Sequence, residues 1–231
     1  MISSRSVSLA PAGYRFPREV IAVAVRWYLR YGLSYRDVEQ LLCERGIDVD
    51  HVTVYRWVQT FTPEFIDAAR PLRHAAGDRW FVDETYVKVA GRWTYLYRAV
   101  DQHGQVIDVL VCERRDAAAA RAFFARALKW SCSGRGHHRP GTGLPAGHRR
   151  VGAFRPARAR AVLEQRCGSD HGRLKTRLRP MQGMKTISAL RHVAAGHAFV
   201  QNLRRGHYEI TVDVPVQDRI LSAFAQLAPS L

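Results

Sequence analysis

The sequence is poor in acidic residues and in paired cysteines, and it has no long apolar run. Asp and Glu total 20 against 36 Lys and Arg, which gives a formal net charge of +16 over 231 residues. A chain this basic repels itself unless it meets a polyanion, so nucleic acid is the first partner to expect and an anionic membrane surface the second. With 47% hydrophobic and 10% aromatic residues, the composition is nevertheless that of a folded protein.

The cysteines and the apolar segments exclude several protein classes. None of the four cysteines forms a Cys-x-x-Cys pair, so we expect neither a zinc site nor a disulfide framework. No stretch reaches the roughly 18 consecutive apolar residues of a transmembrane helix. Residues 1–13 have one basic residue and lack the apolar segment of a signal peptide. We therefore expect a cytoplasmic protein without a membrane partner.

Residues 18–61 predict three short helices, because apolar side chains recur there at steps of three and four. Ser34 has the chemistry of a helix N-cap and is followed three residues later by Asp37. Asp50 is placed to cap the third helix, and Pro63 marks the expected limit of that helix.

The second and third of these helices resemble a helix-turn-helix. Thr, Arg and His side chains on such a unit can contact base edges or phosphates in a major groove. A plain three-helix packing unit is the alternative interpretation, but the net charge favours DNA binding. The candidate DNA-contacting residues in this part of the chain are Arg36, His51, Thr53 and Arg56.

After the helices the apolar period changes to two. Strands are expected over 81–89, 93–100 and 106–112, and a helix is expected over 117–128. The first strand carries Asp83 on its core-facing side, whereas Glu84 points to the opposite face. A carboxylate on a core-facing side is costly to bury unpaired, so Asp83 is either a satisfied residue at the strand edge or a cation ligand.

Residues 131–160 show neither the helical spacing of apolar residues nor the strand period of two. They contain seven Arg, six Gly, three Pro and three His but no Lys, Asp or Glu, so they supply +7 of the net charge. One interpretation is a flexible basic loop that clamps DNA, although a loop of this length is unusual inside a compact domain. The other is translation in the wrong frame, since GC-rich coding DNA read out of frame gives Arg, Gly, Pro and Ala. We expect residues 131–167 to be disordered or non-native.

Helical patterning returns in the last quarter of the chain. A polar hexapeptide, 170–175, opens one predicted helix, and a second helix is predicted over 188–203. His171, Arg173 and Lys175 in the hexapeptide are candidates for contacts with DNA phosphates. Simple exposure of these side chains to solvent is the alternative.

These motifs resemble the DDE transposases of the IS-six group of bacterial insertion sequences. The segments that resemble that group's N-terminal helix-turn-helix are 24–28, 33–39 and 52–58. Those that resemble its first catalytic block are 80–89 and 91–101, and those that resemble its last catalytic block are 170–175 and 184–186. The resemblance covers 15–130 and 169–208.

The resemblance implies an α/β fold with a helix-turn-helix domain followed by a ribonuclease H-like, integrase-like catalytic domain. The implied divisions are a DNA-binding domain over 15–62, a linker over 63–78, the catalytic domain over 79–208 and a C-terminal tail over 209–231. It also implies binding to terminal inverted repeats and to target DNA, by a dimer or a higher multimer. The implied reaction is Mg²⁺-dependent cleavage and transfer of DNA strands.

In this family three acidic residues hold the metal ions. The first maps onto Asp83, which the resemblance makes the catalytic and metal-binding residue. The second falls within 131–145, where no acid stands, and the third maps onto Gly168. We therefore expect a degenerate copy with impaired catalysis, because a divalent site depends on its oxygen donors. One alternative is a catalytically dead DNA-binding protein that competes with or represses an active transposase. Another is an unfolded remnant with unpaired sheet edges.

Overall fold

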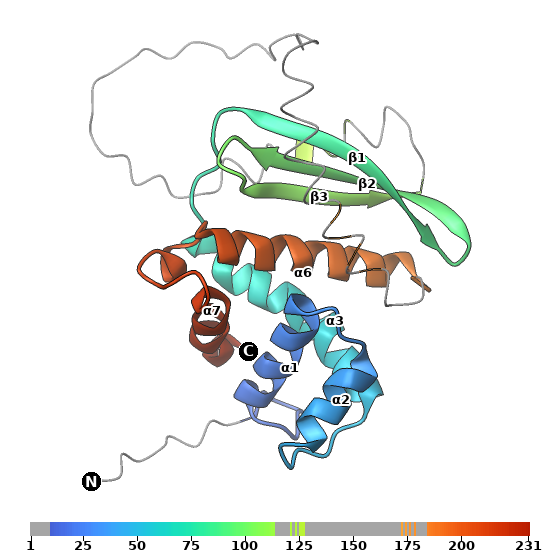
Figure 1. Cartoon of the computed structure of the whole chain (residues 1–231), viewed down its shortest axis with the longest axis vertical. Coiled ribbons are helices and arrows are strands. Elements are labelled where there is room, and N and C mark those ends of the chain that lie inside the picture. The colour runs from blue at the N-terminus through green and yellow to red at the C-terminus, as the bar shows by residue number, and fades with distance from the viewer. Residues whose placement is uncertain are drawn as a thin grey trace.

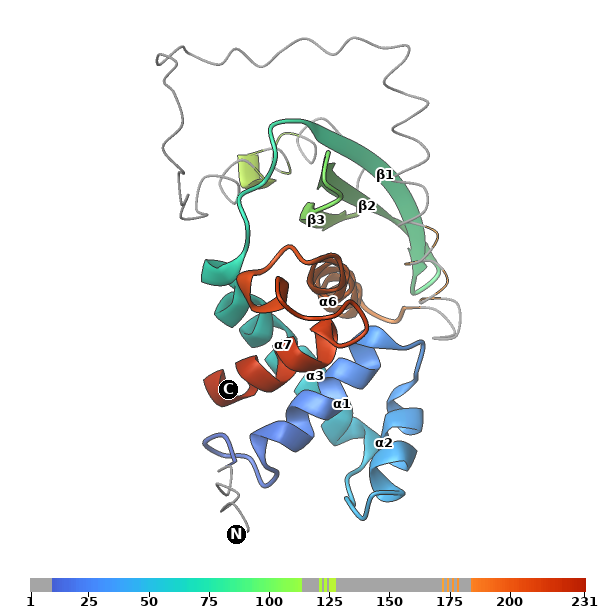
Figure 2. The ribbon, with the colours of Figure 1, turned by 60° about the vertical axis from the view of Figure 1, so that its left-hand side comes forward.

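The computed structural model describes residues 10–113, 121, 123, 125–127, 172, 174, 176, 178 and 184–231. Within these ranges a three-stranded sheet lies over one face of a long helix, α6 (Ile187–Arg205) (Figure 1). The N-terminal helices and the last helix of the chain pack on the other side of α6, so α6 is the middle layer, as Figure 2 also shows. No helix in the described ranges is long and apolar enough to cross a membrane.

Two of the three N-terminal helices, the second and the third, begin where their capping residues predict. The three helices are α1 (Arg18–Arg30), α2 (Tyr35–Cys43) and α3 (His51–Ala69). The Ser34 hydroxyl accepts a hydrogen bond from the Asp37 amide at 3.1 Å, and the Asp37 carboxylate accepts one from the Ser34 amide at 2.7 Å. This reciprocal pair satisfies backbone donors that have no partner inside the helix. The predicted cap of α2 is confirmed.

Helix α3 is longer than the sequence predicted. The Asp50 carboxylate caps its first turn as expected, but the helix does not end at Pro63 and continues to Ala69. Proline in a helix interior removes one backbone hydrogen bond, which ordinarily ends or kinks the helix. Here Phe61 and Phe65 are buried on either side of Pro63. Their burial holds the second half of α3 in the core, so 63–69 are not a linker.

The predicted three-strand meander is confirmed. Strands β1 (Trp80–Val89), β2 (Arg92–Asp101) and β3 (Val106–Cys112) form an antiparallel sheet in the order β1-β2-β3. Ala90 and Gly91 join the first two strands with φ values of 46° and 80°. Positive φ at both turn residues matches the twist of a two-residue hairpin.

The alternation predicted for β1 also holds. Thr85 and Val89 are buried, whereas Val82 and Tyr86 are 37% and 54% exposed. The odd-numbered side chains therefore face α6 and the even-numbered ones face away from it. Asp83 lies on the α6 side and is half-buried.

Side chains cover the outer edge of β3. The Asn202 side chain accepts a hydrogen bond from the Val106 amide at 2.7 Å and donates one to the Val106 carbonyl at 2.9 Å. Arg73 donates to the same carbonyl, and Arg126 donates to the carbonyl of Val109. An edge strand whose polar groups are occupied in this way is a poor template for another strand.

The C-terminal residues 209–231 are part of the core, which corrects the predicted tail. Helix α7 (Arg219–Leu227) buries one face against α1 and α3. Its Phe224 packs on Phe65 of α3 and Phe199 of α6, with ring centroids 4.8 and 5.8 Å apart. The apolar stripe of α7 is visible in the sequence, but a local stripe does not say which surface will cover it.

Several predictions fall wholly or partly outside the described residues. Of the helix expected over 117–128, residues 121, 123 and 125–127 are helical. Of the helix opened by the polar hexapeptide, residues 172, 174, 176 and 178 are helical. Residues 131–167 lie outside the described ranges, as do His171, Arg173 and Lys175. The disorder and the phosphate contacts expected there stay predictions.

Candidate nucleic-acid interface and carboxylate site

The four candidate DNA-contacting residues of α2 and α3 differ in their surroundings. Arg36 and Arg56 are exposed, whereas His51 and Thr53 are partly buried at the start of α3. The Nδ1 atom of His51 lies 3.1 Å from a carboxylate oxygen of Glu39 and so links α3 to α2. The two arginines are the more accessible cations of the set.

Thr53 also has a role within the protein. Its hydroxyl donates to the Asp50 carboxylate at 2.7 Å, and its amide donates to the same carboxylate at 3.0 Å. The Thr53 hydroxyl first, and then the backbone amides of the first turn, hold the pKa of Asp50 below its usual value. Asp50 therefore stays ionised at the N-terminus of α3, where the helix dipole favours negative charge.

Aromatic contacts hold α2 and α3 against α1. Tyr35 of α2 stacks on Tyr28 of α1, with centroids 4.3 Å apart and an interplanar angle of 6°. Tyr35 also meets Tyr55 of α3 edge to face, with ring centroids 5.4 Å apart. Trp57 of α3 is buried, at 1% exposure, and packs edge to face on Phe16, with ring centroids 5.2 Å apart. The angle between α2 and α3 is consequently set by packing, and the exposed arginines stand on a supported surface.

Asp83 occupies the middle of β1 on the face toward α6. Its carboxylate accepts a hydrogen bond from the Glu84 amide at 2.7 Å. Its direct cross-strand neighbour on β2 is Arg98, which is 1% exposed and shares the same face. Cβ atoms of such neighbours lie about 4.5–5.5 Å apart. Arg98 was not among the residues predicted from the sequence, although its register opposite Asp83 follows from the hairpin turn.

The described residues do not by themselves fit a two-metal centre. Among them, no group of three or more His, Cys, Asp or Glu side chains is placed to hold a metal ion. Glu84 follows Asp83 directly but points to the other face of the sheet. In the sequence no acid stands between Asp116 and Glu164. Two-metal phosphoryl transfer requires several clustered carboxylates, and Asp83 supplies one.

A cavity of about 330 Å³ lies between β3, α6 and the segment after α3. Arg73 and Arg126 line it, but their guanidinium groups bind the edge of β3. Arg126 also pairs with Asp108 at 2.7 Å. Burial raises the pKa of Asp108, and the hydrogen bond from Arg126 opposes that shift. Arg73 and Arg126 are thus engaged in holding the sheet edge.

The described residues thus form a mixed helix and sheet structure that carries the acidic Asp83 on its first strand. The sequence profile of the IS240-type DDE domain matches residues 77–138 and 153–207, slightly more than half of the chain. The chain therefore belongs to this family of insertion-sequence transposases. The match omits residues 139–152, so the segment without family resemblance is shorter than the 131–168 left uncovered by the motifs in the sequence.

Individual relatives agree with this assignment. The chain is 46% identical over 115 residues to a Staphylococcus aureus transposase for insertion sequence-like element IS431mec. These aligned residues make up 50% of this chain and 51% of that protein. The chain is 45% identical over 115 residues to the Staphylococcus aureus transposase for insertion sequence element IS257 in transposon Tn4003, with the same coverage. An uncharacterized protein of Yersinia pseudotuberculosis, pYV0051, is 41% identical over 54 residues, or 23% of this chain and 50% of that protein. The chain thus matches about half the length of these curated relatives, and the resemblance to the IS-six group is confirmed.

Proposed function

We propose that this chain is an insertion-sequence transposase with a working DNA-binding unit and an impaired catalytic centre. The unit is a helix-turn-helix formed by α2 and α3, and its ligand is the terminal inverted repeat of the element. The observation that carries the proposal is the capped and aromatic-braced α2–α3 pair, which presents exposed Arg36 and Arg56.

The first turns of α3 have the properties expected of a recognition helix. Val52 and Tyr55 are 43% and 40% exposed, and Arg56 is exposed beside them. Recognition helices place the side chains of their N-terminal turns against base edges, and the preceding helix crosses the phosphate backbone. In this arrangement Arg56 contacts a base edge or a nearby phosphate, and Arg36 contacts the backbone. His51 and Thr53 contribute through the ends of side chains already bound to Glu39 and Asp50.

The sheet supports a ribonuclease H-like arrangement for the second unit. An antiparallel meander carries Asp83 on its first strand, and α6 crosses the face on which that carboxylate lies. In the family, Mg²⁺ at this position supplies the charge stabilisation for strand cleavage and transfer. Asp83 would be one ligand, but Gly168 stands where the family has the third acid, and 131–145 contain no acid for the second. Catalysis is therefore impaired in this chain.

A second candidate is a DNA-binding protein without catalysis, which competes with an active transposase or represses its promoter. The observation that favours it is that α1, α2 and α3 are complete and that their packing uses no residue of the carboxylate site. Both candidate functions include assembly of the protein as a dimer or higher multimer on DNA.

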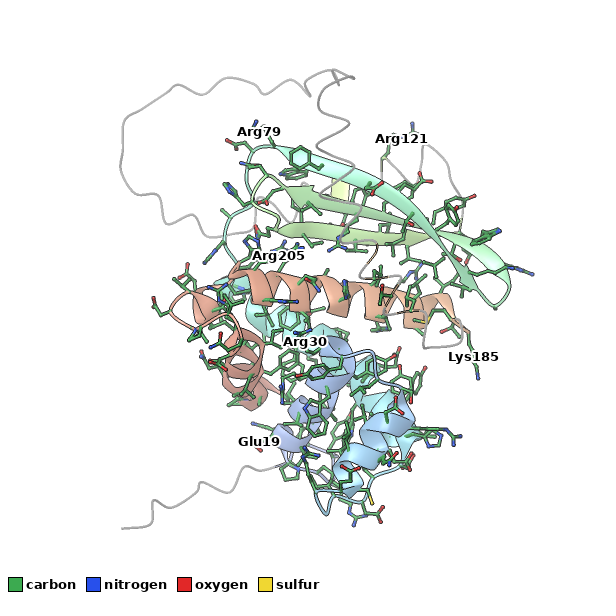
Figure 3. All side chains as sticks on the ribbon, in the orientation of Figure 1. Glu19, Arg30, Arg79, Arg121, Lys185 and Arg205 are labelled. Atoms are coloured by element: carbon green, nitrogen blue, oxygen red, sulfur yellow. The ribbon has the colours of Figure 1, made fainter. Side chains whose placement is uncertain are left out.

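The DNA-binding half can be tested with a gel shift on a duplex that carries the terminal repeat, beside a shuffled duplex. Arg56→Ala should lower the preference for the repeat, and each lost phosphate contact should reduce the slope of affinity against salt by about one. The matched control is Arg204→Ala, which also removes one exposed positive charge. Arg204 is at the end of α6, next to Arg205, which is labelled in Figure 3. Equal losses in the two variants would contradict a helix-turn-helix interface.

A further inference from the structure

Two large aromatic side chains are exposed together where β1 turns into β2. Tyr86 is 54% exposed and Trp93 is 55% exposed. Their rings meet edge to face, with centroids 5.0 Å apart and an interplanar angle of 90°. The Lys88 ammonium nitrogen lies 5.4 Å from the centroid of the Trp93 ring. We call these three residues the hairpin cluster.

The hairpin cluster lies on the sheet face that points away from α6. Lys88 and Trp93 are direct cross-strand neighbours, and Tyr86 is two residues before Lys88 on the same face. Farther along this face, Phe123 packs on Tyr97 with ring centroids 6.0 Å apart and Tyr97 is buried. Aromatic residues thus run along the face, and those at the hairpin end are exposed.

The surroundings of the hairpin cluster are cationic. The Ala90 amide donates to the Met184 carbonyl at 2.8 Å, which brings the exposed Lys185 to the same end of the sheet (Figure 3). Arg92 is exposed at the first position of β2, on the opposite face of the strand. On the sheet face that carries the cluster, β1 also has one acidic residue, Glu84, which stands two residues before Tyr86. An exposed aromatic pair with Lys88 beside it, and with two further cations at the same end of the sheet, matches a ligand that has flat rings and negative charge.

We propose that the hairpin cluster binds an unpaired nucleotide of DNA, with the base stacked on Trp93 and Tyr86 and its phosphate near Lys88. The proposal rests on DNA as the ligand of this family member, but it concerns a surface separate from α2 and α3. In Figures 1 and 2 the hairpin end and α2 lie on the same side of the molecule, so one DNA molecule can approach both.

The ligand must be unpaired because bases in a duplex stack on each other and hide their faces. An exposed aromatic side chain gains stacking area from a base in single-stranded DNA or from one turned out of the duplex. Such stacking tolerates any base and is worth between about 5-fold and 150-fold in affinity for each base when the aromatic residue is replaced by alanine.

The experiment compares two ligands of equal length and charge, an oligothymidylate and an abasic sugar-phosphate oligomer. Affinity for each is measured by fluorescence anisotropy on the full chain, and the ratio of the two affinities reports base stacking alone. Trp93→Ala should lower this ratio by about 5-fold to 150-fold, whereas Trp93→Phe should keep most of it. Lys88→Met should weaken both ligands together and leave the ratio unchanged.

The matched control is Tyr31→Ala. Tyr31 is 47% exposed, and the Arg30 guanidinium lies 5.4 Å from its ring centroid. Tyr31 is therefore another exposed aromatic residue with a cation beside it, but it stands at the end of α1. An unchanged ratio in Trp93→Ala, or an equal fall in Tyr31→Ala, would overturn the proposal. A change in self-association of Trp93→Ala with an unchanged ratio would overturn it in favour of a contact between copies of the chain. Arg56→Ala separates the two proposals, because it should weaken repeat binding and leave this ratio unaltered.

Discussion

Replacing Phe224 by alanine should strongly destabilise the protein, including the unit that carries the candidate DNA contacts. Phe224 is 1% exposed and contacts Phe65 and Phe199, so its removal leaves a cavity where α7, α3 and α6 meet. The second half of α3 is held by this contact, and its first half carries Arg56. Loss of α7 packing should therefore reach the DNA-binding surface through α3.

The magnitude follows from the burial of the ring. Truncating a fully buried Phe to Ala costs about 3–5 kcal/mol, which includes the lost transfer energy and the cavity that remains. Domains of this kind are stable by about 5–15 kcal/mol, so the variant loses a large part of its stability. With a urea dependence of about 2 kcal/mol per molar, a loss of about 4 kcal/mol lowers the unfolding midpoint by about 2 M.

The assay is urea unfolding followed by circular dichroism, with Leu221→Ala as the control. Leu221 lies on the same helix but is 51% exposed, so its truncation should change the free energy of unfolding by no more than about 0.5 kcal/mol. If Phe224→Ala costs less than about 1 kcal/mol, or no more than the control, α7 is not part of the core as described.

Two further predictions concern the junction of α6 with the sheet. Asn202→Leu should cost about 1–3 kcal/mol in urea unfolding, because the Val106 amide loses its side-chain acceptor and the Val106 carbonyl keeps only the donor from Arg73. An unchanged midpoint would show that this edge needs no cover. Burial chiefly lowers the pKa of His207 to about 4, with Arg205 contributing in the same direction and Asp101 opposing it. Since the unfolded chain binds this proton below about pH 6.5, stability should fall as pH drops from 6.5 toward 4, and His207→Gln should flatten that dependence.

The sequence predicted those features of the fold that depend on local chemistry. Ser34 and Asp50 are recognisable caps because their side chains reach amides two or three residues away. The face of Asp83 follows from the period of two in β1 and needs no knowledge of the tertiary structure. These predictions hold in the structure because each one rests on neighbours close in the chain.

Features that depend on distant partners were missed. Pro63 is a correct signal for a weakened helix, but the burial of Phe65 against α7 overrides it, and α7 lies more than 150 residues further along the chain. The buried position of Arg98 is likewise set by the α6 layer and by its register with Asp83. Local periodicity carries no information about such contacts. The carboxylate site stays a prediction for a different reason, because the segments that should complete it lie outside the described residues.

The central proposal is that this family member binds its terminal repeat and that its impaired catalytic centre leaves the repeat uncut. The most direct test incubates the full chain with an end-labelled repeat duplex and Mg²⁺ or Mn²⁺, and then runs the same sample on native and denaturing gels. The account predicts a retarded, salt-sensitive complex on the native gel and intact strands on the denaturing gel. Cleaved or joined strands that disappear in Asp83→Ala would contradict the impaired centre, and the absence of any complex would contradict the DNA-binding unit.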